Sequence, residues 1–284
     1  MLPSAAPVME FCSWVSPMPY DGVMRIPLLS ACALVAALTP TWATSQVLDT
    51  DVPFVVSPPA VTQAMLDLAR VGPKDFVIDL GSGDGRIVIL AAKKYGARGL
   101  GVEIDPKLVS VSRENARKAD VTARAEFRDE DLFKTDLTRA SVITMYLLPD
   151  VNLLLRPRLL ALKPGTRIVS HDWDMGDWPP DEEVTIPVPE KALGVSKTSR
   201  VMRWTVPARL EGVWCSKDWK GKQLTIRQKY QRAEGTLGQT SVDGTIEGMR
   251  LRSNVGDGTL IGDRLTFDAK SVAKGEWRRQ LCGK

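Results

Sequence analysis

Acidic residues and glycines alternate in one short stretch of the chain, residues 79 to 85, which reads Asp-Leu-Gly-Ser-Gly-Asp-Gly. In a glycine-rich loop ahead of a helix, backbone N–H groups form a site for an anionic group at the positive end of that helix. Asp79 and Asp84 add carboxylates, which attract a cationic amino group and repel a pyrophosphate. The stretch therefore predicts a zwitterionic ligand.

A further acidic residue, Glu103, ends the next apolar segment, twenty positions after Gly83. An acid at that point can accept both hydroxyl groups of a ribose. S-adenosylmethionine combines an amino group, a carboxylate and a ribose with no phosphate. It therefore fits these residues better than a nicotinamide dinucleotide, although the glycine spacing alone does not separate the two.

The segments that must position these residues alternate between strand and helix. Ser57 as N-cap and Gly72-Pro73 as a stop predict a first helix. The apolar periods predict strands at residues 76–80, 99–104, 125–128, 141–147 and 167–171, and helices at 86–95, 106–119 and 151–162. Candidate closing strands follow at 183–188 and 201–206. This order predicts a doubly wound, Rossmann-like, mostly parallel sheet with helices on both faces, an α/β fold.

The helical period disappears from about residue 210, and a different pattern begins. Gly235, Gly244 and Gly258 each start a Gly-Thr-aliphatic element, and short alternating segments lie between turns rich in Gly and Asp. This pattern predicts a small all-β domain, a meander or a barrel. The predicted domains are therefore a signal-like segment at 1–46, an α/β domain at 47–208 and a β domain at 209–284.

The first 46 residues have the composition of a targeting segment. Arg25 precedes a short apolar run, and small residues follow at Ala43 and Ser45. This three-part pattern predicts an export signal, and hence an exported or envelope-associated protein. A disordered or weakly anchored tail is the alternative; it would associate with the membrane only through this segment. An exported enzyme would be separated from the cytoplasmic cofactor pool, so a cytoplasmic location stays open.

Cysteine, histidine and charge limit the other classes of protein. The four cysteines are Cys12, Cys32, Cys215 and Cys282, and the last two could pair in an oxidising compartment or remain free thiols. With one histidine and no Cys-x-x-Cys pair, no metal site is expected. A net charge of +4 over 284 residues gives no indication of nucleic-acid binding.

Four runs together resemble a known family. They are Val77-Ile-Asp-Leu-Gly-Ser-Gly-Asp-Gly-Arg-Ile-Val, Gly101-Val-Glu-Ile-Asp-Pro, Leu108-Val-Ser-Val-Ser-Arg and Asp131-Leu-Phe-Lys. The chain resembles class I S-adenosylmethionine-dependent methyltransferases over residues 52–181, and within them the relatives of the ATP synthase c-subunit lysine N-methyltransferase. The resemblance implies that Asp131, with Leu132 and Phe133, flanks the adenine. The predicted cofactor-binding residues are Asp79, Gly81, Ser82, Gly83, Asp84, Gly85, Glu103, Ile104, Asp131 and Leu132.

The methyl acceptor is predicted by the resemblance to be a lysine amine of a protein. Methyl transfer from a sulfonium is an in-line displacement, so few residues need to be reactive. Tyr146, after the fourth strand, could steer the amine, and His171, after the fifth, is the one side chain that titrates near neutrality. Both have structural alternatives, as a packing aromatic and a hydrogen-bonded core residue. A small-molecule methyltransferase and a non-catalytic binder of S-adenosylmethionine or S-adenosylhomocysteine at the cell envelope remain alternatives.

Overall fold

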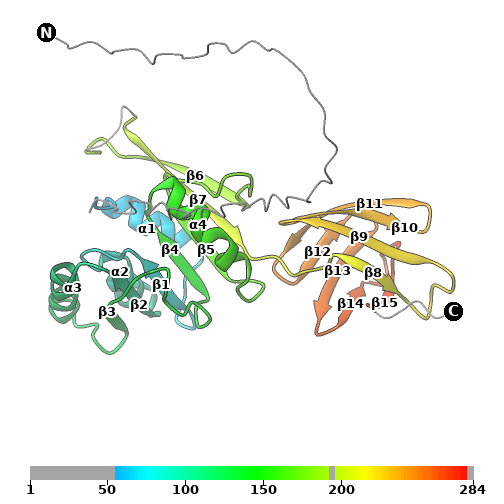
Figure 1. Ribbon diagram of the computed structural model, residues 1–284, viewed down its shortest axis with the longest axis horizontal. Helices are drawn as coiled ribbons and strands as arrows, with labels where there is room; N and C mark the ends of the chain where they lie inside the picture. Colours follow the sequence, from blue (N-terminus) through cyan, green and yellow to red (C-terminus); the bar gives the residue numbers. More distant parts are fainter. Residues whose placement is uncertain (1–54, 192–195, 280–284) are drawn as a thin grey trace, which may run out of the picture. The chain divides into compact units, whose positions relative to one another are not determined.

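A seven-stranded sheet and a closed barrel make up the computed structural model, which describes residues 55–191 and 196–279 (Figure 1). The sheet has the order β3-β2-β1-β4-β5-β7-β6. Its strands are β1 (Phe76–Leu80), β2 (Arg98–Glu103), β3 (Ala125–Asp129), β4 (Val142–Met145), β5 (Arg167–His171), β6 (Glu182–Pro187) and β7 (Thr198–Thr205). Strands β1 to β5 are parallel, and β7 and β6 close one edge as an antiparallel pair. The predicted fold class is confirmed.

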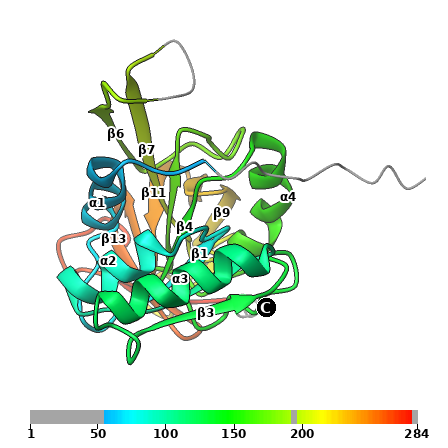
Figure 2. The same cartoon turned by 90° about the vertical axis from the view of Figure 1, so that its left-hand side faces the viewer.

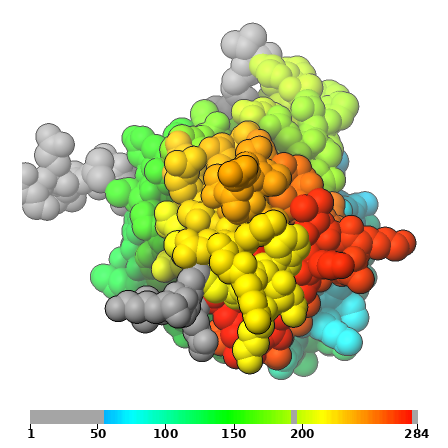
Figure 3. Space-filling view, turned by 90° about the vertical axis from the view of Figure 1, so that its right-hand side faces the viewer, coloured from blue at the N-terminus to red at the C-terminus, as the bar shows by residue number. Residues whose placement is uncertain are grey.

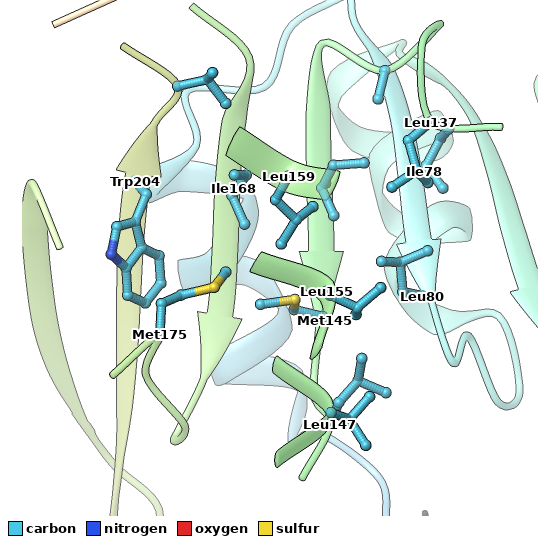
Figure 4. Close-up of a cluster of buried hydrophobic side chains, with 14 of the residues drawn as sticks. Ile78, Leu80, Leu137, Met145, Leu147, Leu155, Leu159, Ile168, Met175 and Trp204 are labelled. Atoms are coloured by element: carbon cyan, nitrogen blue, oxygen red, sulfur yellow. The ribbon is translucent and has the colours of Figure 1, made fainter. Parts of the chain in front are cut away.

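Helices cover both faces of this sheet. They are α1 (Pro59–Leu68), α2 (Arg86–Tyr95), α3 (Pro106–Lys118) and α4 (Pro149–Leu160). Neighbouring residues of one strand face opposite sides. Val77 of β1 therefore packs with α1 and α2, whereas Ile78 packs with α4. Figure 2 shows α1, α2 and α3 apart from α4, and Figure 4 shows Leu155 and Leu159 of α4 against Ile78, Met145 and Ile168.

Local residue chemistry determines where most of these helices begin and end. Asp105 caps α3 by accepting a hydrogen bond from the N–H of Lys107. Gly96 ends α2 in the left-handed conformation that glycine adopts without strain. The prediction for α1 was wrong in one detail: Pro58 occupies the N-cap, and Ser57 does not cap the helix. Its hydroxyl is used elsewhere, in the site described below.

The barrel consists of eight antiparallel strands in the order β10-β11-β12-β13-β14-β15-β8-β9. Its strands are β8 (Gly212–Cys215), β9 (Gln223–Lys229), β10 (Arg232–Leu237), β11 (Thr240–Glu247), β12 (Arg250–Ser253), β13 (Gly256–Ile261), β14 (Arg264–Phe267) and β15 (Gly275–Arg278). The pairing of Arg278 with Cys215 closes it. Buried side chains fill its interior, with Trp214 and Trp277 the largest. Figure 3 faces this part of the protein, coloured from yellow to red.

The Gly-Thr repeats in this part have a steric reason. A Cβ on Gly235 would lie 1.8 Å from the carbonyl oxygen of Thr225, and one on Gly244 would lie 2.4 Å from that of Arg252. Both glycines sit inside strands, where the neighbouring backbone leaves no room for a side chain.

Cys215, at the end of β8, is disulfide-bonded, while Cys282 lies outside the described residues.

The N-terminal segment predicted to direct export, residues 1–46, also lies outside the described residues. By their contacts the sheet and the barrel belong to one compact unit. In the described ranges, no helix combines the length and the apolar character needed to cross a membrane.

Candidate functional site

The glycine loop joins the carboxyl end of β1 to α2, at the point where the strand order changes direction between β1 and β4. Gly81, Gly83 and Gly85 all have positive φ angles, of 73°, 52° and 83°. Side chains other than glycine rarely adopt such angles, so the three glycines allow this chain path. The N–H groups of Gly81 and Ser82 donate to the carbonyl of Val102, at 3.0 and 2.9 Å, and hold the loop against β2.

Glu103 anchors the middle of the loop. One carboxylate oxygen accepts from the N–H of Gly83 at 2.9 Å, and the other accepts from the N–H groups of Ile104 and Asp105, at 2.8 and 3.1 Å. A carboxylate offers about four acceptor positions, so these three bonds leave acceptor capacity on Glu103 for a hydroxyl group. The structure therefore explains the twenty-residue spacing: Glu103 and Gly83 are hydrogen-bonded neighbours.

Asp79 is the buried acid of the site, with 3% of its surface exposed. One carboxylate oxygen accepts a hydrogen bond of 2.7 Å from the hydroxyl of Thr144 on β4. Burial raises the pKa of Asp79 to about 7, opposed by the Thr144 bond and reinforced by the charges of Glu103 and Asp84. A cation placed beside this group would favour its ionised form, so the site is suited to an amino group.

Asp84 has a different role from the one predicted by its charge. Its carboxylate pairs with Arg86, whose Nε and Nη2 donate at 2.9 and 2.6 Å. These contacts lower the pKa of Asp84 against the effect of its burial. Arg86 Nη1 also donates to the carbonyl of Ser57 at 2.8 Å. The charge of Asp84 is therefore balanced inside the loop, which leaves Asp79 and Glu103 as the acids without a basic partner there.

Asp131, Leu132 and Ile104 lie at the carboxyl ends of β3 and β2. Asp131 accepts from the N–H of Phe133 at 2.8 Å and pairs with Lys134 at 3.4 Å, so it caps the turn that follows β3. Ile104 is 71% exposed, which is unusual for a large apolar side chain, and it provides an apolar surface next to Glu103. The adenine contacts of these residues stay a prediction.

The residues at this edge fit S-adenosylmethionine. Asp79 offers a carboxylate for the amino group, and Glu103 has acceptor capacity for the ribose. Ser82 Oγ is buried without a hydrogen-bond partner among the described residues, so it is available to a ligand. When bound, this cofactor supplies an electrophilic methyl group on a sulfonium. In the same part of the chain, no cluster of three or more His, Cys, Asp or Glu residues could hold a metal ion.

The two residues predicted to act on the acceptor, Tyr146 and His171, lie at the carboxyl ends of β4 and β5. The rings of Tyr146 and His171 pack together, with centroids 3.9 Å apart and planes tilted by 31°. Both ring nitrogens of His171 are hydrogen-bonded, Nδ1 to Ser57 Oγ and Nε2 to Ser199 Oγ, each at 2.9 Å. Burial lowers the pKa of His171 to about 4, although the charge of Asp172 acts in the opposite direction.

This environment favours the structural role of His171 over the catalytic one. A general base for an amine works best with a pKa near the operating pH and a free nitrogen within reach of the proton. His171 is buried, has both nitrogens occupied and stays neutral near pH 7. Its arrangement is that of a residue that positions Tyr146. Tyr146 itself is partly buried, and burial raises its pKa.

Sequence reasoning missed the roles of two residues that complete this arrangement, Ser57 and Arg86, whereas Asp172 was considered as a wall of the acceptor channel. Ser57 connects the two sides, because its carbonyl accepts from Arg86 and its hydroxyl bonds His171. Asp172 has a positive φ of 61°, which is uncommon for a residue other than glycine, and it follows β5 directly. The charge of Asp172 and its place at a strand end were visible in the sequence. The partners of Ser57 and Arg86 were not, because they lie far away along the chain.

A mostly parallel sheet with this strand order, a glycine loop after β1 and acids at the carboxyl ends of β1 and β2 define a class I S-adenosylmethionine-dependent methyltransferase. The comparisons agree. Residues 79–182 match the model of the ANTKMT methyltransferase domain. The chain is 42% identical over 137 residues to a protein-lysine N-methyltransferase of Saccharolobus islandicus, covering 48% of this chain and 85% of that protein. The chain therefore belongs to the family of this archaeal methyltransferase.

Two further relatives show where the similarity ends. An adenine nucleotide translocase lysine N-methyltransferase of Mus musculus is 38% identical over 131 residues, which cover 45% of this chain and 56% of the mouse protein. The chain thus spans little more than half the length of that relative. The solved structure of an RNA methyltransferase from Salinibacter ruber, in complex with S-adenosylhomocysteine, is 49% identical, with a TM-score of 0.50. That match covers 55% of this chain and 96% of the other.

Proposed function

We propose that this methyltransferase transfers the methyl group of S-adenosylmethionine to the side-chain amine of a protein lysine. The single observation that carries the proposal is that the Tyr146 ring and the Asp172 carboxylate both lie against the imidazole of His171, with a ring-centroid distance of 3.9 Å and an Oδ2–Nε2 distance of 3.5 Å. An aromatic face and a carboxylate both attract a cationic amine. The name of the archaeal relative, a protein-lysine N-methyltransferase, supports the same acceptor.

The chemistry asks the protein for alignment more than for reactivity. A lysine ammonium with a pKa of roughly 10.4 must lose its proton before its lone pair can attack a methyl group. A surface that excludes water favours the neutral form of the amine. Tyr146, which is partly buried against His171, supplies such a surface. Asp79 and Glu103 hold the cofactor, while Ser57 links their loop to the acceptor side. Alignment of two bound reactants then accounts for most of the rate.

An RNA acceptor is the second candidate, since the Salinibacter ruber relative is described as an RNA methyltransferase. A nucleobase carries no positive charge at neutral pH and gains nothing from the carboxylate of Asp172. We therefore rank the lysine acceptor first and use RNA as a separate arm of the test.

The test is methyl transfer by the full-length chain with S-adenosylmethionine that carries a tritiated methyl group. Three acceptor pools are compared: proteins of a bacterial lysate, total RNA, and the small-molecule fraction of the same lysate. We expect label in protein, and mass spectrometry should place it on lysine. Glu103→Gln serves as a matched control that should lower labelling of every pool. Label in RNA or small molecules alone would contradict a lysine acceptor, and cofactor binding without any label would indicate a non-catalytic binder.

The proposal extends to location: the protein acts outside the cytoplasm or at the envelope, where residues 1–46 direct it and could also hold it at the membrane. The disulfide of Cys215 supports this, because disulfides persist mainly in oxidising compartments. Fusing residues 1–46 to a reporter enzyme that needs disulfides for activity tests it. An active fusion in a bacterial host is expected, whereas a cytoplasmic, inactive fusion would favour a cytoplasmic methyltransferase.

A further inference from the structure

Asp172 already binds a lysine ammonium group of its own chain. Lys191, in the connection between β6 and β7, places its Nζ 2.7 Å from Asp172 Oδ2 and 2.7 Å from the carbonyl oxygen of Thr198. Two of the three N–H donors of this ammonium are therefore satisfied by a carboxylate and a carbonyl. Each of the two charged side chains is 16% exposed, so the pair is partly buried but within reach of solvent.

This pair lies next to the proposed acceptor side. Asp172 Oδ2 is 3.5 Å from Nε2 of His171, and the ring of His171 packs on Tyr146. The negative charge of Asp172 also contributes to the raised pKa of Tyr146, after burial, which agrees with their closeness. Asp172 and Tyr146 therefore contact the same imidazole ring, that of His171.

The backbone holds Asp172 in place independently of Lys191. The N–H of Asp172 donates to the carbonyl of Arg200 at 2.8 Å, and its Oδ1 accepts from the N–H of Arg200 at 3.0 Å. These two bonds to β7 keep the residue at its positive φ of 61°. Backbone strain of this kind persists where the surrounding structure fixes it, and it is concentrated at functional sites. The second oxygen, Oδ2, is left for an ammonium group.

We propose that Asp172 is the carboxylate that receives the ammonium group of the acceptor lysine, and that Lys191 occupies this position until the acceptor displaces it. The inference rests on the proposed function and deepens it. Displacement exchanges one ammonium group for another on Asp172, so the carboxylate keeps a charge partner, and release of Lys191 restores the conformational freedom of its side chain. A lysine delivered by a bound protein can therefore replace Lys191. After displacement the ammonium group must leave the carboxylate and release its proton to water; its lone pair then forms the N–C bond as the S–C bond of the sulfonium breaks and S-adenosylhomocysteine leaves.

Steady-state methylation of poly-L-lysine by the full-length chain tests the proposal. Lys191→Met removes the ammonium group and keeps most of the apolar stem, so KM for poly-L-lysine should fall by about threefold to fivefold, with kcat little changed. Asp172→Asn should raise KM by about tenfold. Asparagine keeps an oxygen for the N–H of Arg200 and tolerates a positive φ, so this variant should fold. Lys197→Met is the matched control, because Lys197 Nζ bonds the carbonyl of Lys191 and not Asp172; its KM should equal the wild-type value.

A binding measurement gives a second readout that does not depend on turnover. With S-adenosylhomocysteine present, calorimetry should show tighter binding of poly-L-lysine to Lys191→Met and weaker binding to Asp172→Asn than to the wild type. Affinity for S-adenosylhomocysteine itself should be the same in all three proteins, because these residues do not touch the glycine loop. Thermal unfolding of each variant checks that it is folded.

The outcomes separate the two proposals. If the wild type methylates poly-L-lysine and Lys191→Met has an unchanged or higher KM, the inference about Lys191 is overturned and the lysine acceptor stands. If Asp172→Asn keeps the wild-type KM and affinity, Asp172 is not the receiving group. If the wild type methylates RNA and no lysine acceptor, the proposed function fails and this inference fails with it.

Discussion

Lowering the pH from 8 to 6 should weaken binding of S-adenosylhomocysteine by about tenfold, because Asp79 must be ionised to attract the amino group of the ligand. Burial gives this carboxyl group a pKa of about 7 in the free protein. At pH 8 most molecules carry the charge, whereas at pH 6 only about one in ten does. A bound ammonium lowers the pKa of Asp79, so binding at pH 6 must first remove a proton.

The size of the effect follows from this equilibrium. One pH unit below the pKa of the free group, the apparent Kd rises about tenfold, which equals roughly 1.4 kcal/mol of lost binding free energy. The pKa of His171 is about 4, and the pKa of Asp84 is lowered by Arg86, so neither changes charge between pH 6 and pH 8.

Isothermal titration calorimetry at pH 6, 7 and 8 and constant ionic strength measures how the Kd for S-adenosylhomocysteine changes with pH. Two controls isolate Asp79. Asp79→Asn keeps an oxygen for the hydroxyl of Thr144 but cannot ionise, so its affinity should be lower and independent of pH. Methylthioadenosine, which lacks the amino-acid part, should bind the wild type equally at all three values. A flat wild-type profile, or an equal slope in Asp79→Asn, would refute the electrostatic reasoning.

Three further predictions concern stability and use thermal or chemical unfolding. Gly101→Ala should destabilise the protein by about 1–3 kcal/mol, because the added Cβ would lie 2.6 Å from the Phe127 ring, whereas Gly72→Ala, with no atom within 4 Å, should be nearly neutral. Cys215→Ser should lose about 2–4 kcal/mol and become insensitive to reductant; an equal loss on reducing the variant would contradict the role of the disulfide. Between pH 6.5 and 4 the buried His171 should lower stability as the pH falls, because the imidazole takes up a proton more readily when unfolded, whereas the raised pKa of Asp79 acts in the opposite direction. The stability of the wild type relative to His171→Gln should therefore fall over this range, and a difference that does not change with pH would count against it.

The parts of the fold with local signals were predictable from the sequence. The bounds predicted for β1, α2 and β5 coincide with those observed, because glycine or proline interrupts the apolar pattern at their ends. The β domain was predicted only as a meander or barrel. Its closure depends on the pairing of Arg278 with Cys215, two residues far apart in sequence, and such a pairing leaves no periodic trace in either strand.

The candidate site, like the fold, was predictable from the sequence only in part. The glycines and the spacing to Glu103 identified the cofactor edge, since a loop after β1 and an acid after β2 must meet at one edge of a parallel sheet. The pairing of Asp84 with Arg86 was missed, because a residue's charge does not reveal its partner. Ser57 was interpreted as a helix cap, yet its hydroxyl bonds His171, 114 positions away. Contacts between residues so far apart along the chain cannot be inferred from local sequence patterns.

The packed interior of the barrel has a consequence for how this part of the protein can evolve. Eight-stranded barrels are just wide enough to be filled by side chains or to enclose one small molecule. Here Trp214 and Trp277 are fully buried, and their indole N–H groups bond backbone carbonyls of the same domain. Any molecule that the barrel binds must therefore contact the outer surface of its strands and its turns. Substitutions on that outer surface can change specificity while the hydrophobic centre stays as it is.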